Sequence, residues 1–451
     1  MVPVVGYAEE IVKVPEGDLM AISYLKQAPM YSDVVTTEVR ATVSEMLTRI
    51  ESGGDEAVRD YSRRLDDWDP PSFIVSAPEV TSAAGRVPED LRHHIEFAQA
   101  QVRGFAQAQR ASMTDLEVET LPGVVLGHKH IAVGNVGSYV PGGRYPLVAS
   151  AFMTIIVPKV AGVPRVVACA PPWRGSGIHP TMLHAIATSG ADEIVCLGGV
   201  QALAAMAFGL GGIEPVDMIV GAGNAYVAEA KRQLFGRVGI DLLAGPTEVL
   251  VVADETADPE LVAADLLGQA EHGPTSPAIL ITTSEALGKQ VISDVDRLLE
   301  TWPTAEVAGT AWRDHGSVAV VEDRDAAIEL ANSYAPEHLE VQVAEEDLAY
   351  FQSRLHNFGS LFLGAQATVA YGDKAVGTNH VLPTMGAARY TGGLWVGKFL
   401  KTCTYQRLTE NGTALVAPAV AAISTAELMF GHALTATMRL DRLAQTTTRP
   451  A

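Results

Sequence analysis

The order of hydrophobic and polar positions along this chain predicts strands that alternate with helices. Short apolar runs are typical of strands buried in a parallel sheet, and longer stretches with helical spacing separate them. The first series predicts strands at residues 165–170, 193–197, 218–220 and 240–243, and helices at 147–162, 179–190, 200–211 and 224–236. The second predicts strands at 249–252, 278–282 and 317–321, and helices at 259–269, 284–302 and 325–333. We therefore expect an α/β fold with two similar domains, each with a parallel sheet covered on both faces.

The rest of the chain has a less regular pattern. Residues 1–24 lack periodicity and are expected to form an arm. Helices are predicted at 37–51, 55–65 and 88–110, and strands at 121–126 and 131–139. From about Gly393 onwards the pattern predicts a separate helical arm, with a mostly apolar helix at 417–439.

Composition and charge narrow the class of protein. The chain has 451 residues, of which 48% are hydrophobic and 19% charged, which is typical of a globular protein with more than one domain. A formal net charge of −21 argues against nucleic acid as a partner, and an anionic small molecule would need a local cationic group. The sequence has neither a secretory signal pattern nor an apolar run of membrane-spanning length. We expect a cytoplasmic protein with no membrane partner.

The three cysteines do not indicate a disulfide framework or a thiolate metal cage, because no Cys-x-x-Cys spacing occurs. Cys169 and Cys196 fall within predicted strands and are expected in the core. Cys403 lies in a segment predicted to lead from a loop into a helix. No His or Asn stands at a spacing that would make it a nucleophile.

One helix end offers two groups that could bind a metal. Asp258-Pro259 indicates a helix start and Gly273-Pro274 a stop, so Gln269 and His272 lie one turn apart near the end of that helix. Side chains three positions apart share a helix face. An imidazole and an amide oxygen can hold zinc when distant segments supply the other ligands. Taken alone, the pair is also compatible with an ordinary helix C-terminus.

The last third of the chain contains polar groups that could complete such a site. They are Glu337 and His338, the loop residues Asp373, Lys374, Asn379 and His380, and Glu427 and His432 near the C-terminus. Oxygen and nitrogen ligands without thiolate are typical of catalytic zinc rather than of a closed structural site. By itself, the Glu337–His338 pair could also be a solvated turn.

A second motif points to a nucleotide. Gly221-Ala-Gly-Asn-Ala-Tyr226 follows a predicted strand and opens a predicted helix, as a dinucleotide-binding turn does, but it lacks the third glycine. Its backbone N–H groups could contact a phosphate or ribose at the helix N-terminus. A tight strand–helix turn without a ligand is an equal alternative.

Taken together, these motifs resemble the histidinol dehydrogenase family, over about residues 38–439. Eight motifs occur in the family's order: Tyr-Val-Pro-Gly-Gly at 139–143, Gly-Gly-Val-Gln-Ala at 198–202, Gly-Ala-Gly-Asn-Ala-Tyr-Val at 221–227, Ala-Gly-Pro-Thr-Glu-Val-Leu at 244–250, Gln-Ala-Glu-His-Gly-Pro at 269–274, Glu-His-Leu at 337–339, Gly-Thr-Asn-His-Val-Leu-Pro-Thr at 377–384 and Glu-x4-His at 427–432. The resemblance implies a zinc- and NAD-dependent enzyme that oxidises a primary alcohol to a carboxylic acid in two hydride transfers.

The resemblance also implies a domain organisation. Two incomplete Rossmann-like domains with parallel sheets would be joined by N- and C-terminal helical arms exchanged in a homodimer with shared active sites. The expected division is an arm at 1–24, a first domain with the zinc and catalytic residues at 25–138 and 247–392, a second domain for NAD at 139–246, and a C-terminal helical arm at 393–451.

Roles for individual residues follow from the same resemblance. The zinc ligands would be Gln269, His272, Asp373 and His432 of the partner subunit. Glu337 and His338 would be the acid/base pair, and Tyr139, Gln201 and Asn224 would contact NAD. Substrate contacts are expected from Thr247, Gln269, His272, His338, Asp373, Lys374, His128, Glu427 and His432.

The chemistry suits these residue types. A neutral imidazole near pH 7 can take the alcohol proton, and a carboxylate can draw the proton from the water that hydrates the aldehyde. Adjacent residues in a strand point to opposite faces, so Glu337 and His338 are expected on an irregular segment if both face the substrate.

Departures from the histidinol enzymes bear on the substrate. Lys374 stands where they typically have an aromatic residue, Thr247 replaces a usual serine and Ala222 a proline. Residues 388–402 resemble the sulfopropanediol dehydrogenase branch instead. A lysine would repel the ammonium of histidinol but would gain a charge-assisted hydrogen bond of about 1.5–3 kcal/mol with a sulfonate. His128 would add a second polar group on the approach to the site.

We therefore expect the oxidation of 2,3-dihydroxypropane-1-sulfonate to sulfolactate. L-histidinol is the alternative substrate. Lys374 could instead point to solvent or pair with an acid. A protein of another class, which binds nucleotide or metal without catalysis, is the third alternative, and the intact Glu337, His338 and candidate ligands argue against it.

Overall fold

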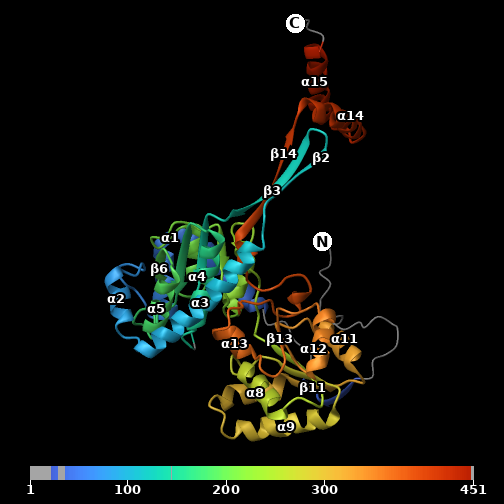
Figure 1. Ribbon diagram of the computed structural model, residues 1–451. Coiled ribbons are helices and arrows are strands. Elements are labelled where there is room, and N and C mark those ends of the chain that lie inside the picture. Colours follow the sequence, from blue (N-terminus) through green and yellow to red (C-terminus); the bar gives the residue numbers. More distant parts are fainter. Residues whose placement is uncertain (1–21, 29–35, 144, 448–451) are drawn as a thin grey trace.

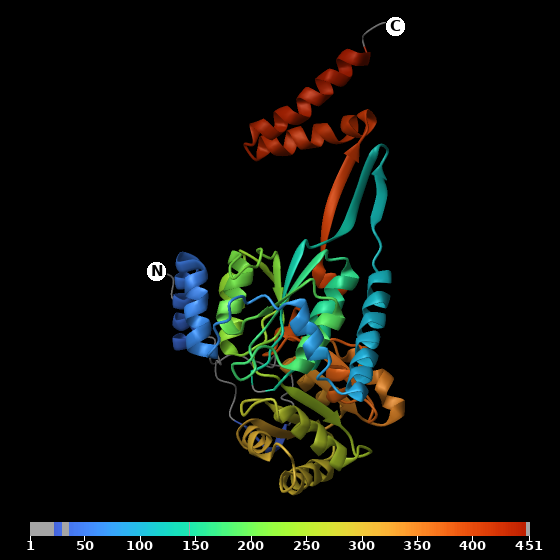
Figure 2. The ribbon, with the colours of Figure 1, turned by 90° about the vertical axis from the view of Figure 1, so that its left-hand side faces the viewer.

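The structure is a computed structural model that describes residues 22–28, 36–143 and 145–447. It consists of two α/β units and a long antiparallel ribbon that ends in two helices, well apart from both units (Figures 1 and 2). Of the N-terminal arm expected at 1–24, residues 1–21 lie outside the described part. In the described part, no helix is both long and apolar enough to cross a bilayer.

The first unit has a five-stranded parallel sheet. Its order is β6 (Glu193–Cys196), β5 (Arg165–Ala170), β4 (Asn135–Tyr139), β7 (Met218–Val220) and β8 (Gly239–Ile240). Side chains of β5 alternate between two apolar cores, because successive residues of a strand face opposite sides. One core includes α4 (Val148–Ala161) and α5 (Pro180–Ser189), and the other α6 (Gly199–Phe208) and α7 (Ala225–Leu234).

Three N-terminal helices complete this unit. They are α1 (Thr37–Asp66), α2 (Ala77–Ala84) and α3 (Glu89–Ala111). Helix α1 packs on α6 and α7, α2 on α5, and α3 on α4. The grouping of residues 25–138 with 247–392 does not hold for these helices, because they pack on the helices that cover the sheet of β4. The two helices predicted at 37–51 and 55–65 form one element with a kink at Gly54, and α2 was not predicted.

The second unit has a six-stranded sheet, in the order β1 (Ser23–Lys26), β11 (Gly316–Val320), β10 (Ala278–Thr282), β9 (Val249–Ala253), β12 (His338–Gln342) and β13 (Ser360–Leu363). Only the edge strand β1 is antiparallel among these described strands. One face is covered by α8 (Pro259–Ala270), α9 (Glu285–Leu299) and α10 (Ala305–His315), and the other by α11 (Arg324–Tyr334) and α12 (Glu345–Arg354). The predicted α/β fold with parallel sheets is confirmed.

The projecting ribbon corrects three sequence predictions. Its strands are β2 (Leu116–Leu121), β3 (Val124–Ala132) and β14 (Leu400–Leu408), so the strand predicted at 121–126 spans the turn between β2 and β3. The tail after Gly393 is not wholly helical, and Cys403 lies exposed on β14. Both faces of this ribbon meet solvent along much of its length, so β14 lacks the apolar run that marks a buried strand.

Two helices, rather than one, form the end of the chain. Helices α14 (Glu410–Ala426) and α15 (Phe430–Thr447) pack on each other, and Leu428 between them adopts a left-handed backbone with φ 60°. The single helix predicted at 417–439 is therefore wrong, because the chain reverses at this residue.

The turn after β7 requires a glycine. Gly221 has φ 117°, and a Cβ there would lie 2.1 Å from the backbone oxygen of Tyr139. We predict that Gly221→Ala lowers the free energy of unfolding by at least about 1–3 kcal/mol, because strained backbone and steric overlap add. Urea unfolding followed by circular dichroism would measure the change.

Gly104→Ala is the matched control. Gly104 lies in α3, and a Cβ there meets nothing within 4 Å. Because alanine favours a helix over glycine by about 0.5–1 kcal/mol, this variant should be as stable as the wild type or more so. Equal stability of the two variants would contradict the close packing of Gly221 on β4.

Candidate active site

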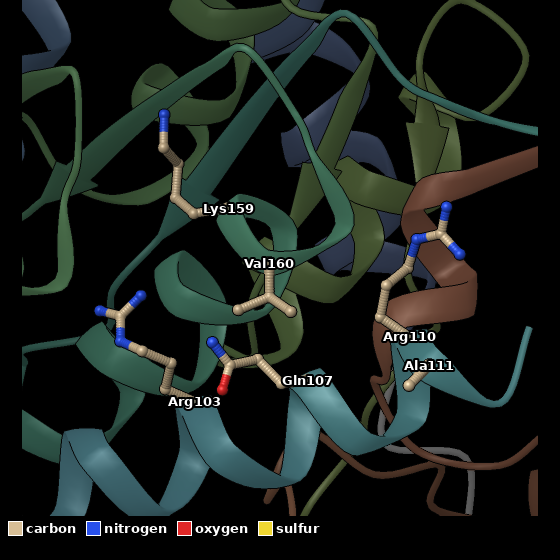
Figure 3. A pocket seen from close by; sticks show the side chains of 6 residues that line it. All are labelled: Arg103, Gln107, Arg110, Ala111, Lys159 and Val160. Atoms are coloured by element: carbon tan, nitrogen blue, oxygen red, sulfur yellow. The ribbon is translucent and has the colours of Figure 1, made fainter.

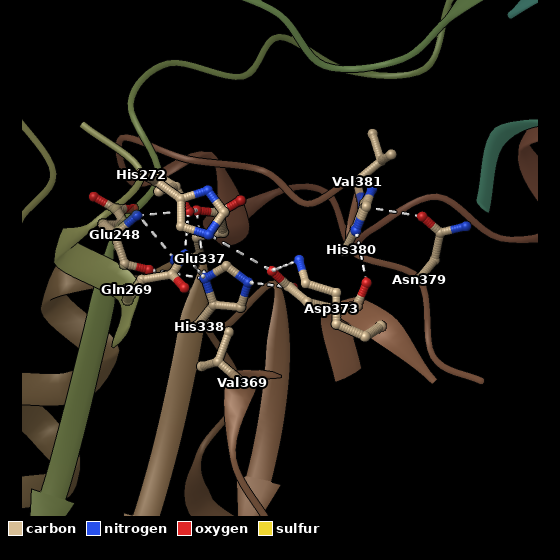
Figure 4. Close-up of polar contacts among 12 residues, drawn as sticks. Glu248, Gln269, His272, Glu337, His338, Val369, Asp373, Asn379, His380 and Val381 are labelled. Atoms are coloured by element: carbon tan, nitrogen blue, oxygen red, sulfur yellow. Dashed lines mark hydrogen bonds and ion pairs between the residues drawn. The ribbon is translucent and has the colours of Figure 1, made fainter. Parts of the chain in front are cut away.

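A cluster of polar side chains lies at the amino ends of two neighbouring strands of the second unit (Figure 4). Glu337 directly precedes β12, and His338 is its first residue. Glu248 directly precedes β9, the parallel neighbour of β12. Gln269 lies in the last turn of α8. Asp373 belongs to the short helix α13 (Val369–Lys374).

Glu337 and His338 face the same site although they are adjacent in sequence. Glu337 Oε2 lies 3.4 Å from His338 Nδ1, and both side chains are almost fully buried. Glu337 lies in the loop before β12, and His338 is the first residue of that strand. The expectation that both residues lie on an irregular segment is therefore met only by Glu337. The strand itself was not predicted, because its buried Glu340 and Gln342 conceal an apolar pattern.

The proton on the His338 ring can be assigned from its neighbours. The backbone carbonyl of Glu248 lies 2.9 Å from Nδ1 and can only accept a hydrogen bond, so Nδ1 is the protonated nitrogen. His338 Nε2 is buried and has no hydrogen-bond partner among the residues that the structure describes. It lies 3.6 Å from Asp373 Oδ1. In the neutral ring, Nε2 is therefore the atom that can accept a proton.

Burial and charge shift the pKa values of these groups. Burial raises the pKa of Glu337 to about 7. Burial lowers the pKa of His338, but the charges of Glu337 and Asp373 outweigh it and raise that pKa to about 9. Despite its own burial, Asp373 has a lowered pKa, because the imidazole of His338 and other nearby cationic groups stabilise its charge. The chain alone therefore does not give the neutral imidazole expected near pH 7, because two carboxylates face the ring.

Thr247 connects two of the functional side chains. Its hydroxyl donates to Glu337 Oε2 at 2.5 Å and accepts from the Gln269 amide nitrogen at 2.5 Å. The backbone N–H of Glu248 donates to the same carboxylate oxygen at 3.0 Å. Through these bonds Thr247 positions Glu337 and Gln269, and the substrate contact expected of it stays a prediction, since its hydroxyl can accept one further hydrogen bond.

Glu248 is a buried acid that the sequence analysis did not identify as functional. Its carboxylate accepts the backbone N–H groups of Glu337 at 3.2 Å and of Met385 at 3.1 Å. Burial, together with the charge of Glu337, raises the pKa of Glu248 to about 8. Its position between a glycine-proline motif and an apolar strand gave no signal of this role.

Three of the four expected zinc ligands lie together. His272 Nε2 is 4.0 Å from Asp373 Oδ2, and Gln269, whose amide nitrogen is bonded to Thr247, has its amide oxygen left for a ligand. Desolvation and the charge of Lys374 lower the pKa of His272, which favours the neutral imidazole that metals bind. In the part of the chain described, no three His, Cys, Asp or Glu side chains form a metal cluster by themselves.

The remaining expected site residues lie on the projecting part of the chain. Glu427 ends α14 and His432 lies on α15, both exposed and remote from the cluster in the single chain (Figures 1 and 2). His128 lies on the ribbon strand β3, where its ring meets that of His130 at 5.1 Å. Within one chain, these three residues are not part of the cluster, because the ribbon extends away from both units.

Lys374 lies at the exposed side of the cluster. Its Nζ is 3.8 Å from Asp373 Oδ2, and its side chain is 56% exposed. The alternative given above, that Lys374 points to solvent or pairs with an acid, therefore holds in both forms, since its ammonium group pairs with Asp373 and its side chain also reaches solvent. The ammonium group stands beside a candidate metal ligand, where it can meet a second charged molecule.

The residues expected to contact NAD gather at the carboxyl edge of the other sheet. Tyr139 ends β4, Gln201 lies in the first turn of α6, and Asn224 caps α7 by accepting from the N–H groups of the next turn at 3.0 and 3.1 Å. The chain leaves β4 toward β5 on one side and returns to β7 on the other, and such a switch point is where open α/β sheets bind ligands. Gln201 Oε1 is buried there with no partner in the described ranges.

A buried ion pair holds the turn after β7. Lys231 pairs with Asp241, and its Nζ also donates to the Gly221 carbonyl at 2.9 Å. Asp241 accepts the N–H of Gly221 at 2.8 Å. The sequence analysis missed both charged residues, since neither belongs to a motif with a recognised spacing.

Hydrogen bonds join the two units beside the cluster. In the loop after α13, His380 Nδ1 lies 3.1 Å from the Asp373 carbonyl, and its Nε2 lies 3.0 Å from Ser150 Oγ on α4. Asn379 donates to the Met153 carbonyl on the same helix at 2.9 Å. Helix α4 therefore connects the sheet with the NAD candidates to the loop that follows Asp373.

A hollow of about 420 Å³ lies elsewhere, between α3 and α4 (Figure 3). It is lined by Arg103, Gln107, Arg110, Ala111, Lys159 and Val160. Lys159 is already paired with Asp192 at 2.9 Å, and Arg110 donates to the Met113 carbonyl at 3.1 Å. None of the expected site residues lines it, so the chemistry belongs to the Glu337–His338 cluster.

Comparison with known proteins finds relatives over nearly the whole chain. The family model described as histidinol dehydrogenase matches residues 31–440. A histidinol dehydrogenase homolog of Shouchella clausii is 54% identical over 93% of this chain and 99% of that protein. Sulfopropanediol 3-dehydrogenase of Ruegeria pomeroyi is 48% identical over 94% of this chain and 97% of that protein. The crystal structure of histidinol dehydrogenase from Elizabethkingia anophelis superposes with a TM-score of 0.87, at 34% identity, over 93% of this chain and 95% of that one.

The bridging role of Thr247 predicts a contrast between two variants. Thr247→Val keeps the shape but removes the hydroxyl, so Glu337 loses a hydrogen bond to a charged group worth about 1.5–3 kcal/mol. We expect kcat/KM to fall by about ten- to hundredfold, while Thr247→Ser stays within a few-fold of wild type. Steady-state NADH formation measures both, and equal activity of the two variants would contradict the bridge.

Proposed function

This chain belongs to the histidinol dehydrogenase family of oxidoreductases, and we propose that it uses zinc and NAD to oxidise an anionic primary alcohol, through the aldehyde, to a carboxylic acid. The substrate we propose is 2,3-dihydroxypropane-1-sulfonate, with sulfolactate as product. The observation that supports this most is His338 Nε2, which is buried, unpartnered among the described residues and directed at Asp373.

The donor set fits zinc. Gln269, His272 and Asp373 offer one amide oxygen, one imidazole and one carboxylate within one chain, which leaves room for a fourth ligand. When bound there, zinc would supply Lewis-acid polarisation and orientation of the substrate hydroxyl. A cation on Asp373 would also offset the carboxylate that raises the pKa of His338, and so favour the neutral ring.

His338 is the group that takes the alcohol proton. Its Nδ1 proton is held by the Glu248 carbonyl, so Nε2 faces the substrate side as the base. An imidazole in the neutral form accepts a proton from an alcohol when the donor and acceptor come within about 2.6–3.2 Å. Glu248 and the loop before β9 keep the ring in this orientation.

Glu337 is the group suited to the second oxidation, which needs water. Burial raises its pKa to about 7, so it can exchange a proton near neutral pH. The Thr247 hydroxyl and the Glu248 N–H hold one oxygen, Oε2, and leave Oε1 to draw a proton from the water that hydrates the aldehyde.

The NAD candidates are consistent with a cofactor at the β4–β7 switch point. NAD bound there would accept the hydride. Gln201 Oε1 has no partner in the described chain, and the exposed Asn224 uses its oxygen as a helix cap, which leaves its NH₂ group for a ligand. The Lys231–Asp241 pair fixes the turn between them.

The anionic substrate is supported by charge. A chain of formal charge −21 would repel a sulfonate unless a cationic group stood at the site, and Lys374 is beside Asp373. Sulfopropanediol 3-dehydrogenase of Ruegeria pomeroyi is 48% identical, and histidinol dehydrogenase of Gluconobacter oxydans is 43% identical. L-histidinol stays the alternative substrate.

A homodimer with shared active sites is supported by the projecting helices. Their exposed apolar side chains are Leu415, Ile423, Leu428, Phe430, Leu434 and Met438, each more than half exposed. A contiguous apolar surface of this kind is typical of a protein interface. We propose that it packs on a second copy, so that His432 of the partner subunit completes the zinc site.

The substrate test combines two alcohols with the removal of Lys374. We expect wild-type enzyme loaded with zinc to form NADH faster with dihydroxypropanesulfonate than with L-histidinol. Lys374→Ala should raise KM about three- to tenfold for the sulfonate and leave KM for an uncharged diol unchanged, since a half-exposed charge is partly screened. Absorbance at the NADH band measures each rate.

Lys289→Ala, on the outer helix α9, removes the same charge far from the cluster and should change neither KM. If the enzyme oxidised L-histidinol faster than the sulfonate, we would assign L-histidinol as the substrate instead. Equal effects of Lys374→Ala on both diols would remove Lys374 from the pocket. No NADH with any primary alcohol would favour a binding protein without catalysis.

Hybrid dimers test the shared site. We expect His432→Ala and His338→Ala each to be inactive alone. A mixture should recover up to about a quarter of the wild-type rate, because half of the dimers at random exchange contain one complete site of two. Exchange is verified by native mass spectrometry of subunits with different tags. Exchange without recovered activity would show that each chain completes its own site.

A further inference from the structure

Behind the active-site cluster lies a pair of carboxyl groups that the proposed chemistry does not use. Asp265 lies on α8 and Glu340 on β12, where Glu340 is fully buried. The Gln342 amide nitrogen lies within hydrogen-bond distance of both carboxyl groups, 2.8 Å from Asp265 Oδ2 and 3.2 Å from Glu340 Oε2. Two carboxylates held this close inside a protein cannot both be charged without a large cost, so the pair holds one proton between them.

The surrounding donors indicate which group keeps the negative charge. Thr368 Oγ1 donates to Asp265 Oδ1 at 2.9 Å, and Gln342 Nε2 donates to Asp265 Oδ2 at 2.8 Å. Glu340 accepts the Val369 N–H at 2.8 Å and a longer contact from Gln342 at 3.2 Å. With two good donors on separate oxygens, Asp265 is the charged member. Burial and this charge raise the pKa of Glu340 to about 8, so it is the protonated member.

The pair joins the three elements that bear the active-site residues. Asp265 lies one turn before Gln269 on α8. Glu340 lies two residues after His338 on β12, on the same side of the strand. Thr368 and Val369 begin α13, the helix of Asp373. In the described structure, α8 and β12 therefore carry the two carboxyl groups, and the first residues of α13 donate hydrogen bonds to both of them.

We propose that Asp265 and Glu340 are positioning residues for the active site and that the proton they share fixes α8, β12 and α13 relative to one another. The amide of Gln269, the ring of His338 and the carboxylate of Asp373 then converge on one point. This inference rests on the proposed function, because it assigns the Asp265–Glu340 pair a role in zinc binding and proton transfer. The other face of β12 packs in an apolar core, so the polar cluster is confined to the side that faces α8.

The proton arrangement predicts that two amide variants differ. In Asp265→Asn, the negative charge that the Thr368, Gln342 and Glu340 donors stabilise is removed, so each of these bonds becomes a weaker neutral one or is broken. In Glu340→Gln, the NH₂ group can replace the shared proton toward Asp265 and the amide oxygen can still accept from Val369, so that only the longer contact from Gln342 is lost. Asparagine at 265 should therefore disturb the site, and glutamine at 340 should imitate the wild type.

The test uses the full-length enzyme and measures zinc affinity by competition with a chromophoric chelator at pH 7. We expect Asp265→Asn to weaken zinc binding and lower kcat about ten- to hundredfold, the range seen when groups behind metal ligands are removed. KM for NAD should not change, since the cofactor residues lie on the other unit. Glu340→Gln should stay within about threefold of wild type by the same measures.

A second measurement separates positioning from simple packing. A buried acid whose pKa is raised in the folded state contributes its full stabilisation below the pKa of the unfolded chain, and this stabilisation is lost as pH rises from there to the folded-state pKa. The ionisable group that faces Glu340 is Asp265. For Glu340 these limits are its ordinary value of 4.5 and about 8, so wild-type Tm should fall between about pH 5 and 8, and Glu340→Gln should lose part of that fall. Glu248, whose pKa is also about 8, contributes a further fall of Tm, and this contribution should remain in both proteins.

Several outcomes would overturn the proposal. They are unchanged zinc affinity in Asp265→Asn, equal losses in the two amide variants, or the same fall of Tm between about pH 5 and 8 in Glu340→Gln as in wild type. If Asp265→Asn does not fold, Thr368→Val removes one bond to the same carboxylate and should weaken zinc binding in the same direction. A shift in zinc affinity without turnover of any alcohol would retain the positioning role and reject the proposed reaction.

Discussion

The interaction on which this site depends is the burial of one imidazole among carboxylates. The ring of His338 is held by the Glu248 carbonyl on one side and faces Glu337 and Asp373 on the others. Uncompensated buried charge is costly, so each carboxylate must keep its hydrogen bonds and its neighbours. For Glu337, the Thr247 hydroxyl and the Glu248 backbone N–H meet this demand. The same bonds that stabilise the charges therefore also fix the geometry of the catalytic groups.

The two sheets contribute opposite edges to the enzyme. The cofactor candidates lie at the carboxyl edge of β4 and β7, as expected for a sheet whose strand order reverses there. The Glu337–His338 cluster lies instead at the amino edge of β9 and β12. A short segment leads from β8 to β9 and contains both Asp241, which holds the Gly221 turn, and Thr247. The His380 and Asn379 contacts with α4 join the two units beside the Glu337–His338 cluster.

The projecting ribbon and its helices expose side chains that are not covered by the rest of the described chain. His432 and the exposed apolar side chains of α14 and α15 find no partner within the described part of this chain. A surface of this kind is stable when another molecule covers it. If His432 on this arm is a metal ligand in the partner's site, as proposed, catalysis requires the dimer to assemble. In this strongly negative chain, Lys374 is a cation beside the candidate metal ligand Asp373, and the proposed anionic substrate depends on it.

The sequence by itself determined the features that depend on local pattern. Parallel strands, most helices, the Gly221 turn and the neighbouring pairs Gln269–His272 and Glu337–His338 follow from short-range spacing and turn chemistry. Tertiary structure alone decided the position of α1, α2 and α3 on the cofactor sheet, the strand character of β12 and β14, and the raised pKa of His338. These depend on contacts between residues far apart in the chain. A buried strand with polar side chains, or an imidazole between two carboxylates, exists only after distant elements have packed together.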